Sequence, residues 1–264
     1  MTYPLAHFIQ LPELRLPSEI LHIKPFGLSE AALDDATSVL LPNIILGKQG
    51  EFLFSETIKA TTNFTLLAAN IQVNDEKRTI GELDYIVKNC SSNQVFHVEL
   101  ACKFYLLKED EHATIEGQWI GPNLKDTLLD KLQKFSESQF PLLRHPATKT
   151  ILSGLGISEN ILQRYCVKAM LFVPETFSKK LPLHYQNCVK GIWIKHGDLI
   201  LKPKATYGIP SKREWLLAPE KISTWYTSDA ISETIKEQIA LKKSPLIYEN
   251  LEGCITVFFV VWWE

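Results

Sequence analysis

Hydrophobic residues in this chain gather in short runs that predict strands and helices in alternation. Two runs rich in Ile, Val, Leu, Phe and Tyr, at residues 79–88 and 94–105, flank the polar segment 89–93 and predict a hairpin. The apolar run 64–73 predicts a strand before it, and residues 47–62 carry a moderate helical stripe. A helix followed by three consecutive strands predicts an antiparallel meander with the helix packed on one side.

The rest of the chain carries weaker patterns of the same kind. Leu124, Leu128, Leu132 and Phe135 recur at helical spacing after Asn123, which is a favourable N-cap, and predict a helix. Another helix is predicted from Ser228, and the proline-rich residues 1–41 predict short helical turns and loops. Strands are predicted at residues 166–173, 189–194, 199–202 and 254–262, with 189–194 and 199–202 forming a hairpin.

Charged residues fall on a hairpin face that is expected to be dry. If the turn is symmetric about residues 91–92, Val87 faces Phe96 and Asp84 faces Glu99. Two carboxylates opposite each other on neighbouring strands repel and destabilise the pair. A bound divalent cation turns that repulsion into a site, because hard cations take carboxylate oxygens.

The alternation of side chains extends this face. Glu82 shares it with Asp84, and His97 and Lys103 share it with Glu99 on the partner strand. His97 is interpreted either as a ligand or base, or as a structural histidine bonded to the hairpin. A solvated hairpin face is the alternative to a metal site, and the pattern leaves both open.

Two polar residues accompany the predicted helix that starts near Asn123. Gln139 continues its buried stripe, and Lys131 lies at the edge of the stripe. A polar side chain on a buried stripe is unfavourable unless it is hydrogen-bonded. Gln139 therefore either faces a pocket or ends the helix in solvent before Pro141.

Charge is unevenly distributed along the 264 residues, although the formal net charge is only −2. The segment 164–221 holds eleven Lys or Arg residues against four Asp or Glu. This basic segment is interpreted either as a path for a nucleic-acid backbone with aromatic residues that stack on bases, or as a solvated surface with the aromatics in the core. The aromatics concerned are Tyr185, Trp193, Tyr207 and Trp215, of which Trp193 is expected in the core.

Cysteine usage and the two ends of the chain indicate the compartment. The five cysteines are scattered without CxxC spacing, so neither a zinc site nor a disulfide framework is suggested. The first residues lack the basic start and apolar run of a signal peptide. The apolar tail 254–263 is about half as long as a membrane helix. We expect a reduced, cytoplasmic protein without membrane association.

Several successive motifs resemble those of a bacterial family catalogued as domain of unknown function 1853. They are LGKQGEFLFSE, LLAANIQV, GELDYIV, HVELACKFYL, WIGPNLKDTLLDKL and CVKGIW, and the match runs from about Leu46 to Pro219. That family is grouped by remote similarity with the PD-(D/E)XK nuclease superfamily. The resemblance implies a site made of Asp84, Glu99, Lys103 and Glu51, with Lys131 and Gln139 pointing back to it from the following helix.

The resemblance also implies a fold and an activity. The fold is an α/β, restriction-endonuclease-like mixed sheet flanked by helices over residues 46–175, with an N-terminal extension at 1–45 and a C-terminal α/β extension at 176–264. The activity is Mg²⁺- or Mn²⁺-dependent hydrolysis of phosphodiester bonds in DNA or RNA, with the metal held by Asp84 and Glu99.

One departure from the superfamily pattern favours an alternative function. Glu99 and Lys103 are four residues apart, whereas the superfamily places acid and lysine two apart, at the position that Ala101 occupies here. The alternative is a nuclease-like fold without catalysis that serves as a nucleic-acid or protein binding module.

Overall fold

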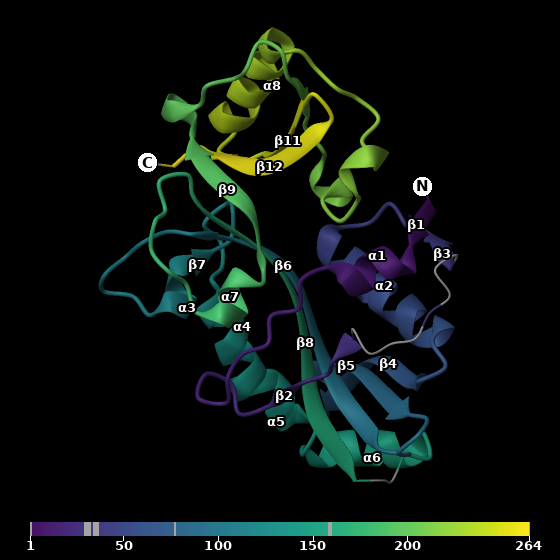
Figure 1. Ribbon diagram of the computed structural model, residues 1–264. Coiled ribbons are helices and arrows are strands. Elements are labelled where there is room, and N and C mark those ends of the chain that lie inside the picture. The colour runs from purple at the N-terminus through teal and green to yellow at the C-terminus, as the bar shows by residue number, and fades with distance from the viewer. Residues whose placement is uncertain (1, 29–32, 34–36, 77, 158–159, 264) are drawn as a thin grey trace. The chain divides into compact units, whose positions relative to one another are not determined.

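The computed structural model describes residues 2–28, 33, 37–76, 78–157 and 160–263 (Figure 1). The chain divides into two compact units. Unit 1 comprises Met1–Pro42, Gly47–Cys102 and Asp130–Lys168, and unit 2 comprises Asn43–Leu46, Lys103–Leu129 and Ala169–Glu264. The domain bounds expected from the sequence, 1–45, 46–175 and 176–264, stay a prediction.

Unit 1 contains a short N-terminal sheet, an antiparallel meander and helices that pack on it. Its strands are β1 (Thr2–Pro4), β2 (Lys24–Pro25), β3 (Ser38–Leu40), β4 (Phe64–Asp75), β5 (Arg78–Asn89) and the first parts of β6 (Val95–Leu107) and β8 (Ile161–Pro174). Its helices are α1 (Leu5–Gln10), most of α2 (Leu46–Ala60) and of α4 (Leu128–Lys134), a π-helical turn (Phe135–Gln139), α5 (Phe140–Leu142) and α6 (Pro146–Gly154).

Unit 2 contains the remaining strands and mostly short helices. The strands are the second parts of β6 and β8, with β7 (Trp119–Ile120), β9 (Val189–Lys195), β10 (Thr206–Gly208), β11 (Leu246–Leu251) and β12 (Cys254–Val261). The helices are α3 (Ile115–Gln118), α7 (Leu183–Gln186) and α8 (Ser228–Ala240), with 3₁₀ turns at His196–Asp198, Lys212–Glu214 and Pro219–Lys221.

The predicted helix and three-strand meander of unit 1 are confirmed. Strands β4, β5 and β6 pair antiparallel in sequence order. The predicted hairpin register is confirmed by Val87 opposite Phe96 and by the N–H of Asn89, which donates to the carbonyl of Gln94 at 2.9 Å. The paired ladder ends at Tyr85 opposite Val98, one step before the acid pair.

The centre of this hairpin is buried on both faces, so the alternative of a solvated hairpin face is wrong for His97 and Glu99, whereas Glu82 and Asp84 are half-buried. On the face of the acids, His97 and Glu99 have no exposed surface. On the other face, Tyr85 contacts Phe54 of α2, with ring centroids 4.5 Å apart. Because His97 and Glu99 are cut off from water, these two polar side chains must find partners inside the protein.

The predicted helix start at Asn123 is wrong. Helix α4 begins at Leu128, and Leu124 adopts a positive φ of 58° with 43% of its surface exposed. The side chain of Asn123 accepts a hydrogen bond from the N–H of Ser244 at 3.2 Å instead of capping the helix. A favourable N-cap residue therefore serves a contact distant in sequence, which local pattern does not reveal.

Unit 2 is organised by a sheet in which β10, β11, β12, β9 and β8 follow one another. The predicted elements at 189–194, 228 onward and 254–262 are confirmed, whereas β11 was not predicted. Helix α8 lies against β11 and β12 (Figure 1) and buries Ile231 and Ile235 against Ile247 and Phe258.

The predicted hairpin of 189–194 with 199–202 is wrong. Strand β9 pairs in parallel with both β8 and β12, so neither edge remains for an antiparallel partner. The residues after β9 form the 3₁₀ turn and continue without strand structure.

The described residues thus form an α/β protein with a mixed sheet of ten strands flanked by helices. Three of the five cysteines, Cys102, Cys166 and Cys188, are buried as small hydrophobic residues, and Cys90 and Cys254 are exposed. None of the described helices is long and apolar enough to span a membrane.

We predict that Gly191→Ala destabilises unit 2. A Cβ atom at this position would overlap the backbone carbonyl oxygen of Val257 on β12, which cannot move without disrupting the β9–β12 pairing. We expect urea unfolding to show a loss of about 3 kcal/mol, as for an overpacked core. Gly197→Ala is the control, because its Cβ would meet no atom within 4 Å. Equal stability of the two variants would contradict this reading.

Candidate functional site

Two carboxyl side chains meet at the buried end of the β5–β6 hairpin. The side chains of Asp84 and Glu99 share a hydrogen bond, and the backbone N–H of Asp84 also donates to Glu99. The N–H of Leu100 donates to Oδ2 of Asp84 at 2.9 Å. The predicted neighbours on the two strands are therefore in direct contact.

Glu99 is held on both oxygens by protein donors. Nε2 of His97 lies 2.7 Å from Oε1, and the side-chain amide of Gln139 donates to Oε2 in a short hydrogen bond. Glu99 has no exposed surface. Its orientation is thus fixed by contacts from β6 itself and from the helical segment that follows the meander.

The pair retains a proton near neutral pH. Burial and, to a smaller extent, the charge of Glu99 raise the pKa of Asp84 to about 7, against the lowering effect of the N–H of Leu100 and the ammonium of Lys131. Burial likewise raises the pKa of Glu99 to about 7, with Lys131 acting in the opposite direction. Their mutual hydrogen bond raises the pKa of Asp84 and lowers that of Glu99.

His97 acts as a neutral donor to this pair. Burial lowers its pKa to about 4, so the imidazole is uncharged at neutral pH and Nε2–H donates to Glu99. Nδ1 is buried and has no hydrogen-bond partner among the described residues. Of the two interpretations of His97, the contact supports a histidine bonded within the hairpin, where it orients Glu99.

Lys131 is the cation whose charge acts on both acids. Its ammonium donates to Oε1 of Gln139 at 3.0 Å and lies 4.0 Å from the ring centroid of Phe135. Gln139 therefore joins Lys131 to Glu99 through its two amide atoms. The alternative in which Gln139 ends the helix in solvent is wrong.

The π-helical turn brings Gln139 to this position. Pro141 has no N–H to donate to the carbonyl four residues earlier, so the regular α-helical ladder cannot continue through it. The N–H of Phe140 accordingly donates to the carbonyl of Phe135, five residues back. Such wide turns inside helices are frequent at functional sites.

Helix α2 adds an ion pair on the side of the acids. Lys48 donates to Glu51 at 2.6 Å, and this bond together with the charges of Glu51, Glu82 and Asp84 raises the pKa of Lys48. Of the two acids of α2, Glu51 therefore neighbours the site, whereas Glu56 pairs with Lys59. Sequence analysis missed Lys48, although its spacing of three residues from Glu51 is that of helical neighbours.

Lys103 has a different partner. It belongs to unit 2, where its ammonium donates to Asp126 at 2.5 Å. Both side chains are about one-third exposed. Its role as the site lysine stays a prediction, and its contact is with Asp126.

The basic segment 164–221 does not offer for stacking the aromatic rings that the sequence analysis selected. The four aromatics considered for stacking, Tyr185, Trp193, Tyr207 and Trp215, are buried, so the stacking interpretation is wrong for these residues. Lys168 is fully buried and donates to the carbonyls of Ile9 and Leu11. Part of the positive charge in this segment therefore serves packing rather than a surface.

The donor set suits a cation that needs few protein ligands. Within the described ranges, no three or more His, Cys, Asp or Glu side chains are grouped to hold a metal ion. Mg²⁺ is held by one or two carboxylates and keeps several waters. Asp84 and Glu99 fit that requirement once the shared proton leaves.

Comparison with known proteins gives one match. A family model described as "Domain of unknown function (DUF1853)" matches residues 24–254. A search of the curated proteins and a search of the solved structures each found no match.

We predict that Asp84→Asn removes a pH-dependent loss of stability. Because burial raises the pKa values of both acids, the folded protein binds more protons than the unfolded chain between about pH 4 and 7, and stability falls as pH rises through that window. Asn keeps the shape and can still donate to Glu99. We expect the variant to exceed wild type by on the order of 2 kcal/mol at pH 8 and by less at pH 5.

Urea unfolding at the two pH values measures this difference. Asp75→Asn is the matched control, because Asp75 is exposed at the end of β4. The acid pair would not hold a shared proton if Asp84→Asn and wild type lost stability in parallel between pH 5 and 8.

Proposed function

The chain belongs to the family described as domain of unknown function (DUF1853), and we propose that it is a Mg²⁺- or Mn²⁺-dependent nuclease with a restriction-endonuclease-like core. The observation that carries the proposal is the contact between Asp84 and Glu99 beside Lys131, where burial raises the pKa of both acids. The order α2, β4, β5, β6 and α4 supports it, because it is the order of elements that the resemblance to the nuclease superfamily implies.

A purely structural role explains the pair poorly. Burying ionisable groups is expensive, and apolar residues of similar volume often serve packing as well or better. Strongly perturbed pKa values concentrate at functional sites, because catalysis and ligand binding require groups that change their protonation near neutral pH. Asp84 and Glu99 have this property, and a cation can replace the proton they share.

Each residue around the pair has a role in this proposal. Asp84 and Glu99 hold the cation, which when bound polarises a phosphate oxygen and makes water a better nucleophile. Lys131 places positive charge where the phosphate gains negative charge. His97 and Gln139 orient Glu99 through the hydrogen bonds to its two oxygens.

Two further side chains act at the margin of the site. Glu51 and Glu82 both act electrostatically on Lys48, whose ammonium is half-exposed at the start of α2. This lysine is free to bind phosphate as a point charge when its bond to Glu51 opens.

A binding module without catalysis is the second candidate. It is favoured by the bond of Lys103 to Asp126, because Lys103 is the lysine that the resemblance to the superfamily assigns to the site. It is also favoured by the protein donors on both oxygens of Glu99, which satisfy the carboxylate without a metal. The two candidates differ in whether the acids bind a divalent cation.

We predict that metal binding depends on Asp84 and strengthens with pH. Because Mg²⁺ or Mn²⁺ must displace the shared proton, the apparent affinity should rise by about tenfold per pH unit below pH 7 and level off above it. Calorimetric titration of wild type, Asp84→Asn and the control Glu56→Gln at pH 6 and 8 measures this. We expect binding in wild type and the control but not in Asp84→Asn. Absence of binding at millimolar metal in folded wild type would exclude the nuclease.

We predict that Lys131, rather than Lys103, supports cleavage. Lys131→Met should lower the rate of metal-dependent hydrolysis of mixed DNA and RNA by about 100-fold, as for loss of one charge at a transition state. Lys103→Met should retain activity within a few-fold, because that ammonium pairs with Asp126. A larger loss of cleavage rate in Lys103→Met than in Lys131→Met would instead identify Lys103 of β6 as the site lysine. Metal binding without cleavage by wild type would favour the binding module.

A further inference from the structure

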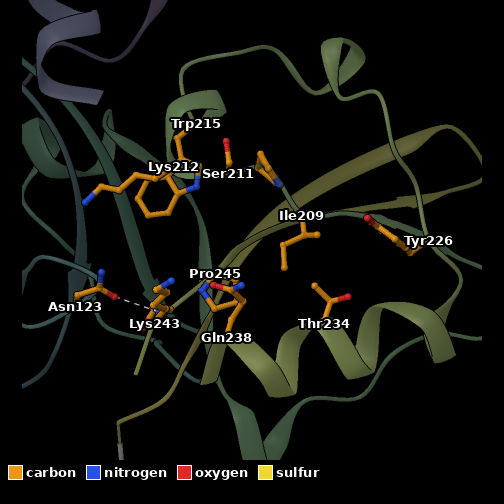
Figure 2. A pocket seen from close by; sticks show the side chains of 12 residues that line it. Asn123, Ile209, Ser211, Lys212, Trp215, Tyr226, Thr234, Gln238, Lys243 and Pro245 are labelled. Atoms are coloured by element: carbon orange, nitrogen blue, oxygen red, sulfur yellow. Dashed lines mark hydrogen bonds between the residues drawn. The ribbon is translucent and has the colours of Figure 1, made fainter. Parts of the chain in front are cut away.

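Unit 2 contains a cavity of about 570 Å³ that the proposed nuclease site does not use. The loop that follows β10 forms one wall, and helix α8 forms another. Figure 2 shows Ser211 and Trp215 on the loop side of the open space and Thr234 and Gln238 on the side of the helix. The segment 243–245, which leads into β11, closes the space between them.

Two buried polar groups in the lining have no partner. The indole Nε1–H of Trp215 and the hydroxyl of Ser244 make no hydrogen bond with the described residues, although the side chains are 8% and 3% exposed. An unpaired buried donor is unfavourable by roughly 1 to 3 kcal/mol, so proteins rarely retain one without a ligand or water to accept from it. The indole N–H can only donate, so an acceptor atom of a ligand that reached it would satisfy it.

The cavity wall is positively charged. Lys212 and Lys243 belong to the lining, which contains no acidic residue. Lys212 lies over the ring of Trp215, 5.6 Å from its centroid. Burial lowers the pKa of Lys212, and the ammonium groups of Lys103 and Lys125 lower it further against the carboxylate of Asp126. An anion that enters this field gains attraction from several lysines.

The remaining lining suits an organic body. Ile209, Pro210 and Pro245 are apolar, and Tyr226 presents an aromatic side chain across the space from Trp215 (Figure 2). The rings of Phe104 and Phe259 both lie 5.1 Å from that of Trp215. Trp215 is therefore fixed by packing against these two rings.

We propose that this cavity binds a small organic phosphate, with phosphate oxygens accepting from Trp215 Nε1–H and the Ser244 hydroxyl and with Lys243 and Lys212 supplying positive charge. A phosphate group offers three strongly accepting oxygens and up to two negative charges. The lining offers several donors and two cations without a carboxylate, which is the complementary arrangement. The volume falls in the range of small-molecule sites and accommodates a mononucleotide.

Calorimetric titration tests the proposal on the full chain with chelator present, so that metal at the acid pair plays no part. The probes are inorganic phosphate, glycerol 3-phosphate and adenosine 5′-monophosphate, with succinate and citrate as carboxylate probes. We expect at least one organic phosphate to bind more tightly than inorganic phosphate and than both carboxylates. We also expect Asp84→Asn to bind it as wild type does, which separates this site from the nuclease proposal.

Three variants assign binding to the cavity. Trp215→Phe keeps a ring against Phe104 and Phe259 but removes the unpaired N–H, Ser244→Ala removes the hydroxyl, and Lys243→Gln removes a charge. Each should weaken binding by about tenfold or more, as for hydrogen bonds to a charged group. Because the hydroxyl of Ser244 has no partner among the described residues, its loss in Ser244→Ala should leave the melting temperature nearly unchanged.

Matched controls lie outside the lining. Trp225→Phe removes an indole N–H that donates to Ile222, and Lys236→Gln removes a lysine of α8 that pairs with Glu233. Neither should change binding. Absence of binding to every organic phosphate, preference for a carboxylate, or unchanged binding in folded Lys243→Gln and Ser244→Ala would each overturn the proposal. If Trp215→Phe does not fold, the other two variants decide.

Discussion

The hydrogen bond between Asp84 and Glu99 determines how the surrounding chain must be arranged. Two carboxyl groups on adjacent strands are tolerated in a dry interior only if one stays protonated and the other finds further donors. Glu99 obtains these donors from His97 and Gln139, and Asp84 obtains one from the N–H of Leu100. These donors come from strand β6 and from the helical segment that follows the meander.

The cations near the pair come from two separate helices. Lys131 lies one helical segment after the meander, and Lys48 lies one helix before it. One lysine precedes the acids in sequence and the other follows them. Lys131 lowers the pKa of Asp84, and the charge of Asp84 raises the pKa of Lys48. The two lysines thus come from the helices before and after the meander, whereas the hairpin supplies the two acids.

The sequence predicted the parts of this structure that depend on local pattern. The alternation of β5 and β6 and the symmetric turn between them placed Asp84 beside Glu99 correctly. The stripe of α4 pointed to Gln139 for a sound reason, since a polar residue on a buried stripe needs a partner. The sequence did not show which lysine acts electrostatically on the acids, because Lys103 and Lys131 are both compatible with the pattern of polar and apolar residues.

Other features were beyond local pattern because they depend on contacts distant in sequence. Asn123 has the chemistry of an N-cap but accepts from Ser244, and β9 has the composition of a hairpin strand but lies between two parallel partners. The aromatics of the basic segment are amphipathic by type, and only the fold shows that Trp215 is packed against Phe104 and Phe259. The cavity beside Trp215 had no signature in the sequence at all.

The π-helical turn has a consequence for how this helix tolerates change in length. A turn that spans five residues instead of four shifts the rotational phase of everything after it by about 100° relative to a regular helix. The segment before Phe135 and the segment after Gln139 therefore present faces that an uninterrupted helix could not present together. Deletion of a single residue in the turn would remove this shift and leave Gln139 rotated away from Glu99. The connection from Lys131 through Gln139 to Glu99 therefore depends on the number of residues in this turn as well as on their identity.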